Sequence, residues 1–172
     1  MKITATRDKI IGLNGVLKKM ADVKDTKFAY MVMKNTLTID AEIEILKKMV
    51  EIPADVQEKL NEFETKRMEF VKQYANKDDK GELIIVNNNY DVTEENLALF
   101  NVEFDKLTEE YKEFLTAKTD NDVKIAELLA EEIDIELRSI SKDKLDFIID
   151  FDDGCPKDLT AKQLDLIRML EE

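Results

Sequence analysis

Apolar residues recur at helical spacing over long stretches of this chain, and little glycine or proline interrupts them. The 172 residues include four Gly and two Pro. The clearest stripe lies within residues 27–51 and comprises Phe28, Met31, Val32, Asn35, Ile39, Ile43, Leu46 and Val50. Steps of three and four residues place these side chains on one face of an α-helix, with Asn35 as the polar exception. Scarce glycine and proline also argue against a sandwich or a barrel.

Two further helices are predicted on either side of this one. Residues 6–20 carry apolar side chains at the same spacing, and the preceding Lys2-Ile3-Thr4 fits a short edge strand. Pro53 then breaks the pattern, because proline cannot continue a helix but fits the first turn of a new one. Residues 54–76 are therefore either a third helix or the kinked continuation of the second.

The middle of the chain predicts an antiparallel pair of helices joined by a small β-hairpin. Residues 94–117 carry a seam with steps of three and four, as in a coiled coil, and Thr93 is a suitable N-cap with Asn96 three residues on. A hairpin insertion at about 82–92 is indicated by a β-branched run followed by three asparagines, which tolerate left-handed geometry. We expect the seam to pack on the stripe of residues 54–76.

The C-terminal part alternates between helix and strand patterns. A short helix is expected over 121–130, and Ile133, Ile135 and Leu137 alternate with charged residues, as in a half-buried strand. Two capped helices should follow, after Ser141 and Thr160, with a turn at 150–156 in which Gly154 is free to take a positive φ. The prediction is a mostly α fold with minor β structure. It has a coiled-coil-like helical bundle over 1–118 and a small acidic α/β element over 119–172 that packs on the same domain.

Charge is distributed unevenly along the sequence. The chain has 39 acidic and 26 basic residues, for a net charge of −13. Residues 1–48 carry ten basic and six acidic residues, whereas residues 120–172 carry seven basic and sixteen acidic ones. Acidic surfaces often serve solubility alone. Such an asymmetry also indicates an interaction surface, and it disfavours binding to nucleic acid or to anionic membranes.

The residue inventory argues against common catalytic and metal sites. There is no histidine, which removes the usual general base near pH 7, and a single cysteine cannot build a thiolate zinc site. Asp150, Asp152 and Asp153 before Gly154 resemble a calcium loop, but the position of the required final Glu is occupied by Ala161. No nucleophile motif, phosphate loop or dinucleotide fingerprint is present. We expect no enzyme activity, no catalytic residues, no metal and no cofactor.

Features of localisation are few. The N-terminus lacks the apolar core of a signal peptide, and no stretch approaches the ~20 apolar residues of a membrane span. Cys155 fits a reducing compartment, and we expect it to be an inert thiol beside a turn. The prediction is a cytoplasmic protein.

Four segments resemble a family of small acidic proteins of unknown function from phages and prophages of Gram-positive hosts. They are KFAYMVMKN at 27–35, KRMEFVKQYANKDDKGEL at 66–83, EIDIELRSISKDKLD at 132–146 and DLTAKQLDLIRMLEE at 158–172. The resemblance implies a phage origin, hence the host cytoplasm or the virion, and a non-enzymatic role. No catalytic motif is part of it.

Two functional hypotheses follow. In the first, the protein binds a basic surface on another protein, such as a host defence factor or a nucleic-acid enzyme, through carboxylates that imitate nucleic-acid charge. The candidate contacts are Glu127, Glu131, Glu132, Asp134, Glu136, Asp150, Asp152 and Asp153. In the second, it is a virion or assembly component, such as a tail or head accessory protein or a chaperone, which docks through its helical hairpin. Homo-oligomerisation stays open in both, because heptad-like seams also pair between chains.

Overall fold

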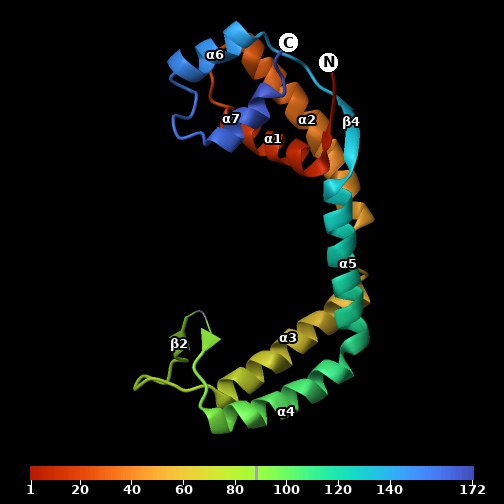
Figure 1. Ribbon diagram of the computed structural model, residues 1–172, viewed down its shortest axis with the longest axis vertical. Helices are drawn as coiled ribbons and strands as arrows, with labels where there is room; N and C mark the ends of the chain where they lie inside the picture. The colour runs from red at the N-terminus through yellow and green to blue at the C-terminus, as the bar shows by residue number, and fades with distance from the viewer. Residues whose placement is uncertain (88) are drawn as a thin grey trace. The chain divides into compact units, whose positions relative to one another are not determined.

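The computed structural model describes residues 1–87 and 89–172, and within them the fold is mostly helical with two small antiparallel sheets (Figure 1). The predicted class, mostly α with minor β, is confirmed. The elements in chain order are β1 (Lys2–Thr6), α1 (Arg7–Lys19), α2 (Thr26–Met49), α3 (Ala54–Tyr74), β2 (Ile85–Val86), β3 (Asn89–Tyr90), α4 (Glu94–Glu110), α5 (Lys112–Ala130), β4 (Glu132–Glu136), α6 (Lys142–Phe151) and α7 (Ala161–Arg168).

The chain forms two compact units whose limits differ from the predicted division at residue 118. Unit 1 combines Met1–Glu51 with Lys124–Glu172, and unit 2 comprises Ile52–Val123. The physical reason is the pairing of β1 with β4, which brings the N-terminal strand to the C-terminal part of the chain in an antiparallel register from Lys2↔Glu136 to Thr6↔Glu132. Local periodicity predicts each strand but carries no information on which strands pair.

The core of unit 1 is built around α1. Its apolar spacing is confirmed, because Ile10, Leu13, Val16, Leu17 and Met20 are all buried. α1 contacts α2 on one side and α7 on another (Figure 1). At Gly12 a Cβ atom would lie 3.0 Å from a methyl group of Leu166, so the glycine lets α7 approach closely.

Asn35, the polar exception in the apolar stripe of α2, is 1% exposed and joins two distant parts of unit 1. Its Nδ2 donates to the carbonyl of Arg138 at 2.9 Å, and its Oδ1 accepts from the N–H of the same residue at 2.7 Å. The amide therefore pairs with the backbone as a neighbouring strand would. It satisfies one donor and one acceptor just after β4 that would otherwise be buried without partners.

Gly154 is required for a reason other than the predicted one. It does not take a positive φ, which among described glycines is found at Gly81. Instead, a Cβ atom at Gly154 would lie 2.0 Å from the carbonyl oxygen of Asp22. The turn after α6 thus packs directly on the backbone that links α1 and α2.

Unit 2 is an α3–α4 hairpin with an aromatic seam, as predicted. The Phe63 ring lies 6.2 Å from Phe104 and 5.8 Å from Tyr111, and Phe100 stacks on Phe104 at 5.6 Å. α2 and α3 are separate helices, which decides the open question at Pro53. The capping of α4 by Thr93, which accepts from the N–H of Asn96, is confirmed.

The β-hairpin of unit 2 is confirmed and is held at the ends of both helices. β2 pairs with β3, and Asn87 takes the left-handed conformation at φ 52°, as an asparagine turn predicts. Asn88, also part of the predicted turn, lies outside the described residues. The side chain of Asn76 donates to Asp91 at 2.9 Å, and that of Asn96 donates to the carbonyl of Tyr74 at 3.2 Å.

The predicted helices over 94–117 and 121–130 are wrong in their boundary. α4 ends at Glu110, and α5 runs without interruption through the Thr- and Asp-rich stretch that suggested a break. Weak helix formers do not end a helix when local bonds support it. Here Lys118 pairs with Asp122 at 2.7 Å, one turn further along α5. The bend falls instead at Tyr111, whose ring is buried against Phe63.

Replacing Asn35 by Ala should lower the free energy of unfolding by about 1–3 kcal/mol, because the backbone N–H and carbonyl of Arg138 lose their partner. Urea unfolding monitored by circular dichroism measures this. Thr38→Ala, at an exposed position one turn away on α2, is the matched control and should leave the midpoint nearly unchanged. Equal midpoints for the two variants would contradict the role assigned to Asn35.

Two glycine substitutions should change stability in opposite directions. Gly154→Ala should lower the free energy of unfolding by about 3 kcal/mol, since the added Cβ atom would overlap the backbone carbonyl of Asp22. Gly15→Ala should stabilise it by about 1 kcal/mol, because Gly15 lies inside α1 with open space around it and alanine favours the helix. Thermal melting of both variants tests the pair. A Gly154→Ala protein as stable as the wild type contradicts the close packing.

Candidate functional site

The outward face of the β1–β4 sheet presents a row of carboxylates. Along β4, Ile135 points into the core and is buried, so the alternate residues Glu132, Asp134 and Glu136 are exposed. Residues two apart on a strand repeat at about 7 Å. With Glu127 in the last turn of α5 and Glu131 between α5 and β4, they form the set that we call the β4 acidic row. The structure therefore brings together five of the eight predicted contact residues.

Two members of the β4 acidic row have cationic partners. Lys2 Nζ lies 2.7 Å from Asp134 Oδ2, and Thr4 Oγ1 donates to the other carboxylate oxygen at 2.6 Å. The Lys2 ammonium, and then the Thr4 hydroxyl, lower the pKa of the Asp134 carboxyl. Glu131 forms an ion pair with Arg7, which also donates to the carbonyl of Leu128 at 3.2 Å.

The remaining carboxylates of the row are available to a partner. Glu127, Glu132 and Glu136 are exposed, and within the described residues none of them has a salt bridge. Antiparallel pairing fixes the backbone of Glu132 and Glu136, and the buried Ile3 and Ile135 hold the sheet against the core. The row is thus a preorganised set of hydrogen-bond acceptors with net negative charge.

The other three predicted contacts lie in a different place. Asp150 ends α6 and is followed by Asp152 and Asp153 in the α6–α7 turn, and Figure 1 shows this turn and β4 on opposite sides of unit 1. Asp152 shapes the turn, because its Oδ1 accepts from the N–H groups of Gly154 at 2.8 Å and Lys24 at 3.4 Å. The side chains of Asp150 and Asp153 are exposed.

Two aromatic residues beside this turn were missed from the sequence. Phe147 and Phe151 are 56% and 70% exposed, and their ring centroids lie 5.5 Å apart. Only Leu145, Ile148 and Ile149 were expected to be buried in this helix, and the first two are fully buried. A signal for them was available in the sequence. This short helix carries apolar residues on two faces, and because only one face can pack on the core, those on the other face must be exposed.

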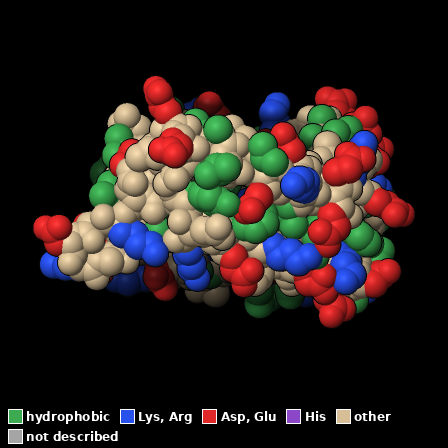
Figure 2. Space-filling model, turned by 90° about the horizontal axis from the view of Figure 1, so that it is seen from below, with side chains coloured by type: hydrophobic (Ala, Val, Ile, Leu, Met, Phe, Trp, Pro, Cys, Tyr) green, Lys and Arg blue, Asp and Glu red, His purple; other side chains and the backbone are tan. Residues whose placement is uncertain are grey.

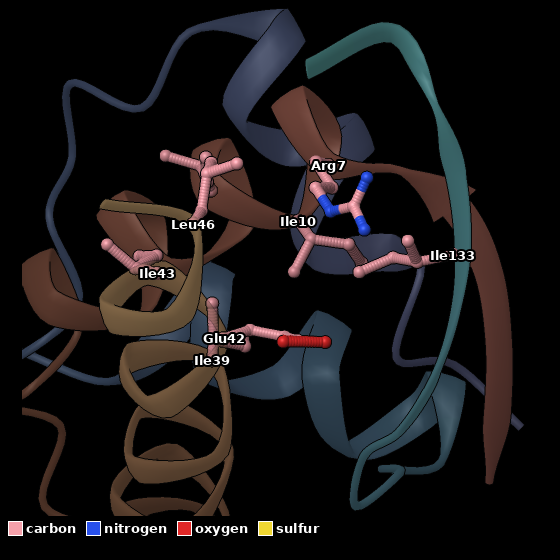
Figure 3. Close-up of a pocket in the computed structure, with 8 residues that line it drawn as sticks. Arg7, Ile10, Ile39, Glu42, Ile43, Leu46 and Ile133 are labelled. Carbon is pink, nitrogen blue, oxygen red and sulfur yellow. The ribbon is translucent and has the colours of Figure 1, made fainter. Parts of the chain in front are cut away.

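The recesses of unit 1 do not bring reactive groups together. Figure 3 shows one between α1, α2 and β4, with Arg7 and Glu42 beside the walls formed by Ile10, Ile43 and Ile133. Its free volume is about 10 Å³, which is room for about one water molecule. A wider recess of about 700 Å³ lies where α2 and α6 begin.

Two of the titratable groups that line the wider recess, Asp25 and Lys144, pair with each other. Lys144 Nζ lies 2.5 Å from Asp25 Oδ2, and the Lys144 ammonium, with the N–H of Phe28, lowers the pKa of the Asp25 carboxyl. Elsewhere in the unit, Cys155 is buried, and this burial raises the pKa of its thiol. A raised pKa disfavours the reactive thiolate, in line with the inert thiol expected from the sequence.

Within the described residues, no three His, Cys, Asp or Glu side chains are grouped so that they could hold a metal ion. No described helix is both long enough and apolar enough to cross a membrane. Comparison of the chain with known protein families, with curated protein sequences and with solved structures finds no match.

Replacing Lys2 by Met should raise the pKa of the Asp134 carboxyl toward the ordinary value of about 3.9, because the ammonium that favours the ionised form is removed. In the wild type, the stabilisation from this pair is present above the ordinary aspartate pKa and is lost as the pH falls through the lowered value. An NMR titration of the Asp134 carboxyl carbon measures the shift. An unchanged midpoint in the variant would show that Lys2 does not interact with Asp134 in solution.

Proposed function

We propose that this protein is a non-enzymatic module that binds a partner protein with a basic surface, and that the β4 acidic row is part of its contact surface. The observation that carries the proposal is the β1–β4 register. It turns Glu132, Asp134 and Glu136 to the same side of a sheet that the core holds in place.

Charge distribution supports the same proposal. Residues 120–172 carry sixteen acidic and seven basic residues, and nearly all of this segment belongs to unit 1. Fixed rows of carboxylates accept charge-assisted hydrogen bonds from arginine and lysine. They also accelerate the approach of a positively charged partner. The preferred partner is therefore a protein that uses a cationic surface, such as one that binds nucleic acid.

The biological setting of the proposal comes from the sequence resemblance to small acidic phage proteins. A phage protein of this kind would act in the host cytoplasm on a host defence factor or a nucleic-acid enzyme. It would occupy the surface that otherwise holds the phosphate backbone.

A second function, as a virion or assembly component, is favoured by the surface of unit 2. Phe70 of α3, Phe104 of α4 and Phe114 at the start of α5 are half-buried around a small core, and Leu99 and Val102 on α4 are exposed. Figure 2 shows hydrophobic side chains open to solvent among acidic and basic ones. Such a hairpin could complete its packing against another subunit. Mass spectrometry of purified phage particles distinguishes the two, because a virion component is present in stoichiometric amounts.

Neutralising the β4 acidic row should weaken partner binding. The variant Glu127→Gln/Glu132→Gln/Glu136→Gln removes the three negative charges of the row that have no salt bridge within the described residues, and it nearly preserves side-chain shape. At about 0.5 kcal/mol for each exposed charge pair, the loss is roughly tenfold in affinity. Proteins captured from a Gram-positive bacterial lysate at several salt concentrations provide the measurement.

A control variant removes the same charge from unit 2. Glu58→Gln/Glu95→Gln/Asp105→Asn replaces three exposed carboxylates that, within the described residues, have no salt bridge. We expect basic proteins to be retained by the wild type and by this control, and to be lost from the row variant. Capture of the same proteins in equal amounts by both variants would contradict the proposal.

A further inference from the structure

The exposed aromatic pair on α6 is the least expected feature of the unit 1 surface. Phe147 and Phe151 follow each other by one helical turn, and their rings are in contact at a centroid distance of 5.5 Å. Phe151 is 70% exposed. Contiguous exposed aromatic side chains are uncommon on a protein that acts alone, and aromatic residues dominate the binding energy of protein interfaces.

The helix that carries this pair is held so that the rings cannot turn into the core. Its opposite face places Leu145 and Ile148 in the core at 0% exposure. Its C-terminal end is tied by Lys157, whose Nζ donates to the carbonyls of Ile149 and Asp152 at 3.2 Å each. The turn that follows packs on Asp22 through Gly154. The rings are therefore displayed by a rigid support, which lowers the entropic cost of binding.

The charges around the rings determine what can cover them. Asp143 lies four residues before Phe147, and Asp150 lies three residues after it, so both flank the rings on the helix surface. Asp153 follows in the turn. All three are exposed and, within the described residues, have no salt bridge.

Within the described residues, none of the nearby lysines forms an ion pair with the carboxylates of this rim. Lys142 pairs with Asp146 at 2.5 Å, and Lys144 pairs with Asp25 at 2.5 Å. Lys157 is bound to backbone carbonyls.

The name α6 patch denotes the two rings, Phe147 and Phe151, with their acidic rim, Asp143, Asp150 and Asp153.

One contact within the chain indicates the preferred chemistry of an occupant. The Lys144 ammonium lies 5.6 Å from the centroid of the Phe147 ring, a cation–π distance. A partner arginine above the rings would form the same type of contact and would reach the unpaired carboxylates of the rim. A second copy of this patch, nucleic acid or an anionic membrane would instead bring negative charge to negative charge.

We propose that the α6 patch is an anchoring site for a partner protein segment that carries arginine or lysine beside apolar side chains. Phe147 and Phe151 fill the apolar contact, and Asp143, Asp150 and Asp153 bind the cations around it. This inference rests on the proposed function in that the partner is basic, but it places the main contact energy on the two rings.

The test uses a synthetic helical peptide with leucines on one face, arginines beside them and a single tryptophan. The protein has no tryptophan, so emission excited at a wavelength where tyrosine does not absorb reports only on the peptide. The variant Phe147→Ala/Phe151→Ala leaves the net charge unchanged. We expect it to weaken peptide binding by at least roughly tenfold, since both anchor side chains are removed.

The matched control is Leu37→Ala/Ile45→Ala, which truncates two side chains of α2 with 59% and 56% exposure and also keeps the charge. It should bind the peptide as the wild type does. Equal binding by the wild type and the Phe variant would overturn the inference, and so would equal weakening by the control. Thermal melting should show that both variants fold, because the truncated side chains are exposed.

Two further measurements are decisive. One tests whether a second copy of the protein occupies the α6 patch, and the other tests whether the basic partner binds the α6 patch or the β4 acidic row. Light scattering that shows a dimer in the wild type and a monomer in the Phe variant would identify a second copy as the occupant and overturn the inference.

If the β4 acidic row proves essential for capture of a basic protein while the Phe variant captures it normally, the proposed function stands and the α6 patch is excluded as its anchor. If the Phe variant loses that protein and the row variant keeps it, the α6 patch is supported and the β4 acidic row is excluded.

Discussion

Antiparallel pairing of β1 with β4 holds together the two ends of the chain, and the rest of unit 1 depends on it. The strands lie more than a hundred residues apart in sequence, and their register places Ile3 and Ile135 in the core. Asn35 reinforces the same connection by binding the backbone of Arg138 immediately after β4. With these contacts in place, α1 can pack between α2 and α7, and the acidic C-terminal segment becomes part of a well-packed unit.

The same pairing determines which surfaces are available. Since a strand alternates its side chains, burying one face of β4 exposes the other, and in this sequence the exposed face is acidic. On α6 the burial of Leu145 and Ile148 likewise exposes Phe147 and Phe151. The core of unit 1 thus fixes two surfaces of different character. One is a row of carboxylates, two of which are paired with Lys2 and Arg7, and the other combines aromatic rings with carboxylates.

Local sequence patterns predicted the elements well where one interaction dominated. The apolar spacing of Ile10, Leu13 and Leu17 predicted the buried face of α1, and the alternation around Ile135 predicted β4. Caps at Thr93 and Thr160 depend on neighbours three residues away and were predicted correctly, whereas the side chain of Ser141 makes no capping hydrogen bond. The break expected after residue 117 was wrong, because the helix propensity of Thr and Asp is weaker than that of alanine by only about 0.7 kcal/mol per residue, which does not by itself end a helix.

Features that depend on distant partners could not be predicted. Nothing near Asn35 indicates that its amide binds residue 138, and nothing near Gly154 indicates its contact with Asp22. Five of the eight candidate contacts, from Glu127 to Glu136, do lie together, because they are close in sequence. Asp152 was grouped with them by charge alone, whereas the structure assigns it to the backbone of the α6–α7 turn.

The central claim is that unit 1 acts by contact through its acidic surfaces. Hydrogen–deuterium exchange of the protein, alone and in complex with a captured partner, tests this most directly. The account predicts slower exchange on complex formation in β4 and at the C-terminal end of α6. Protection confined to α3 and α4 of unit 2, with unchanged exchange in β4 and α6, would contradict it.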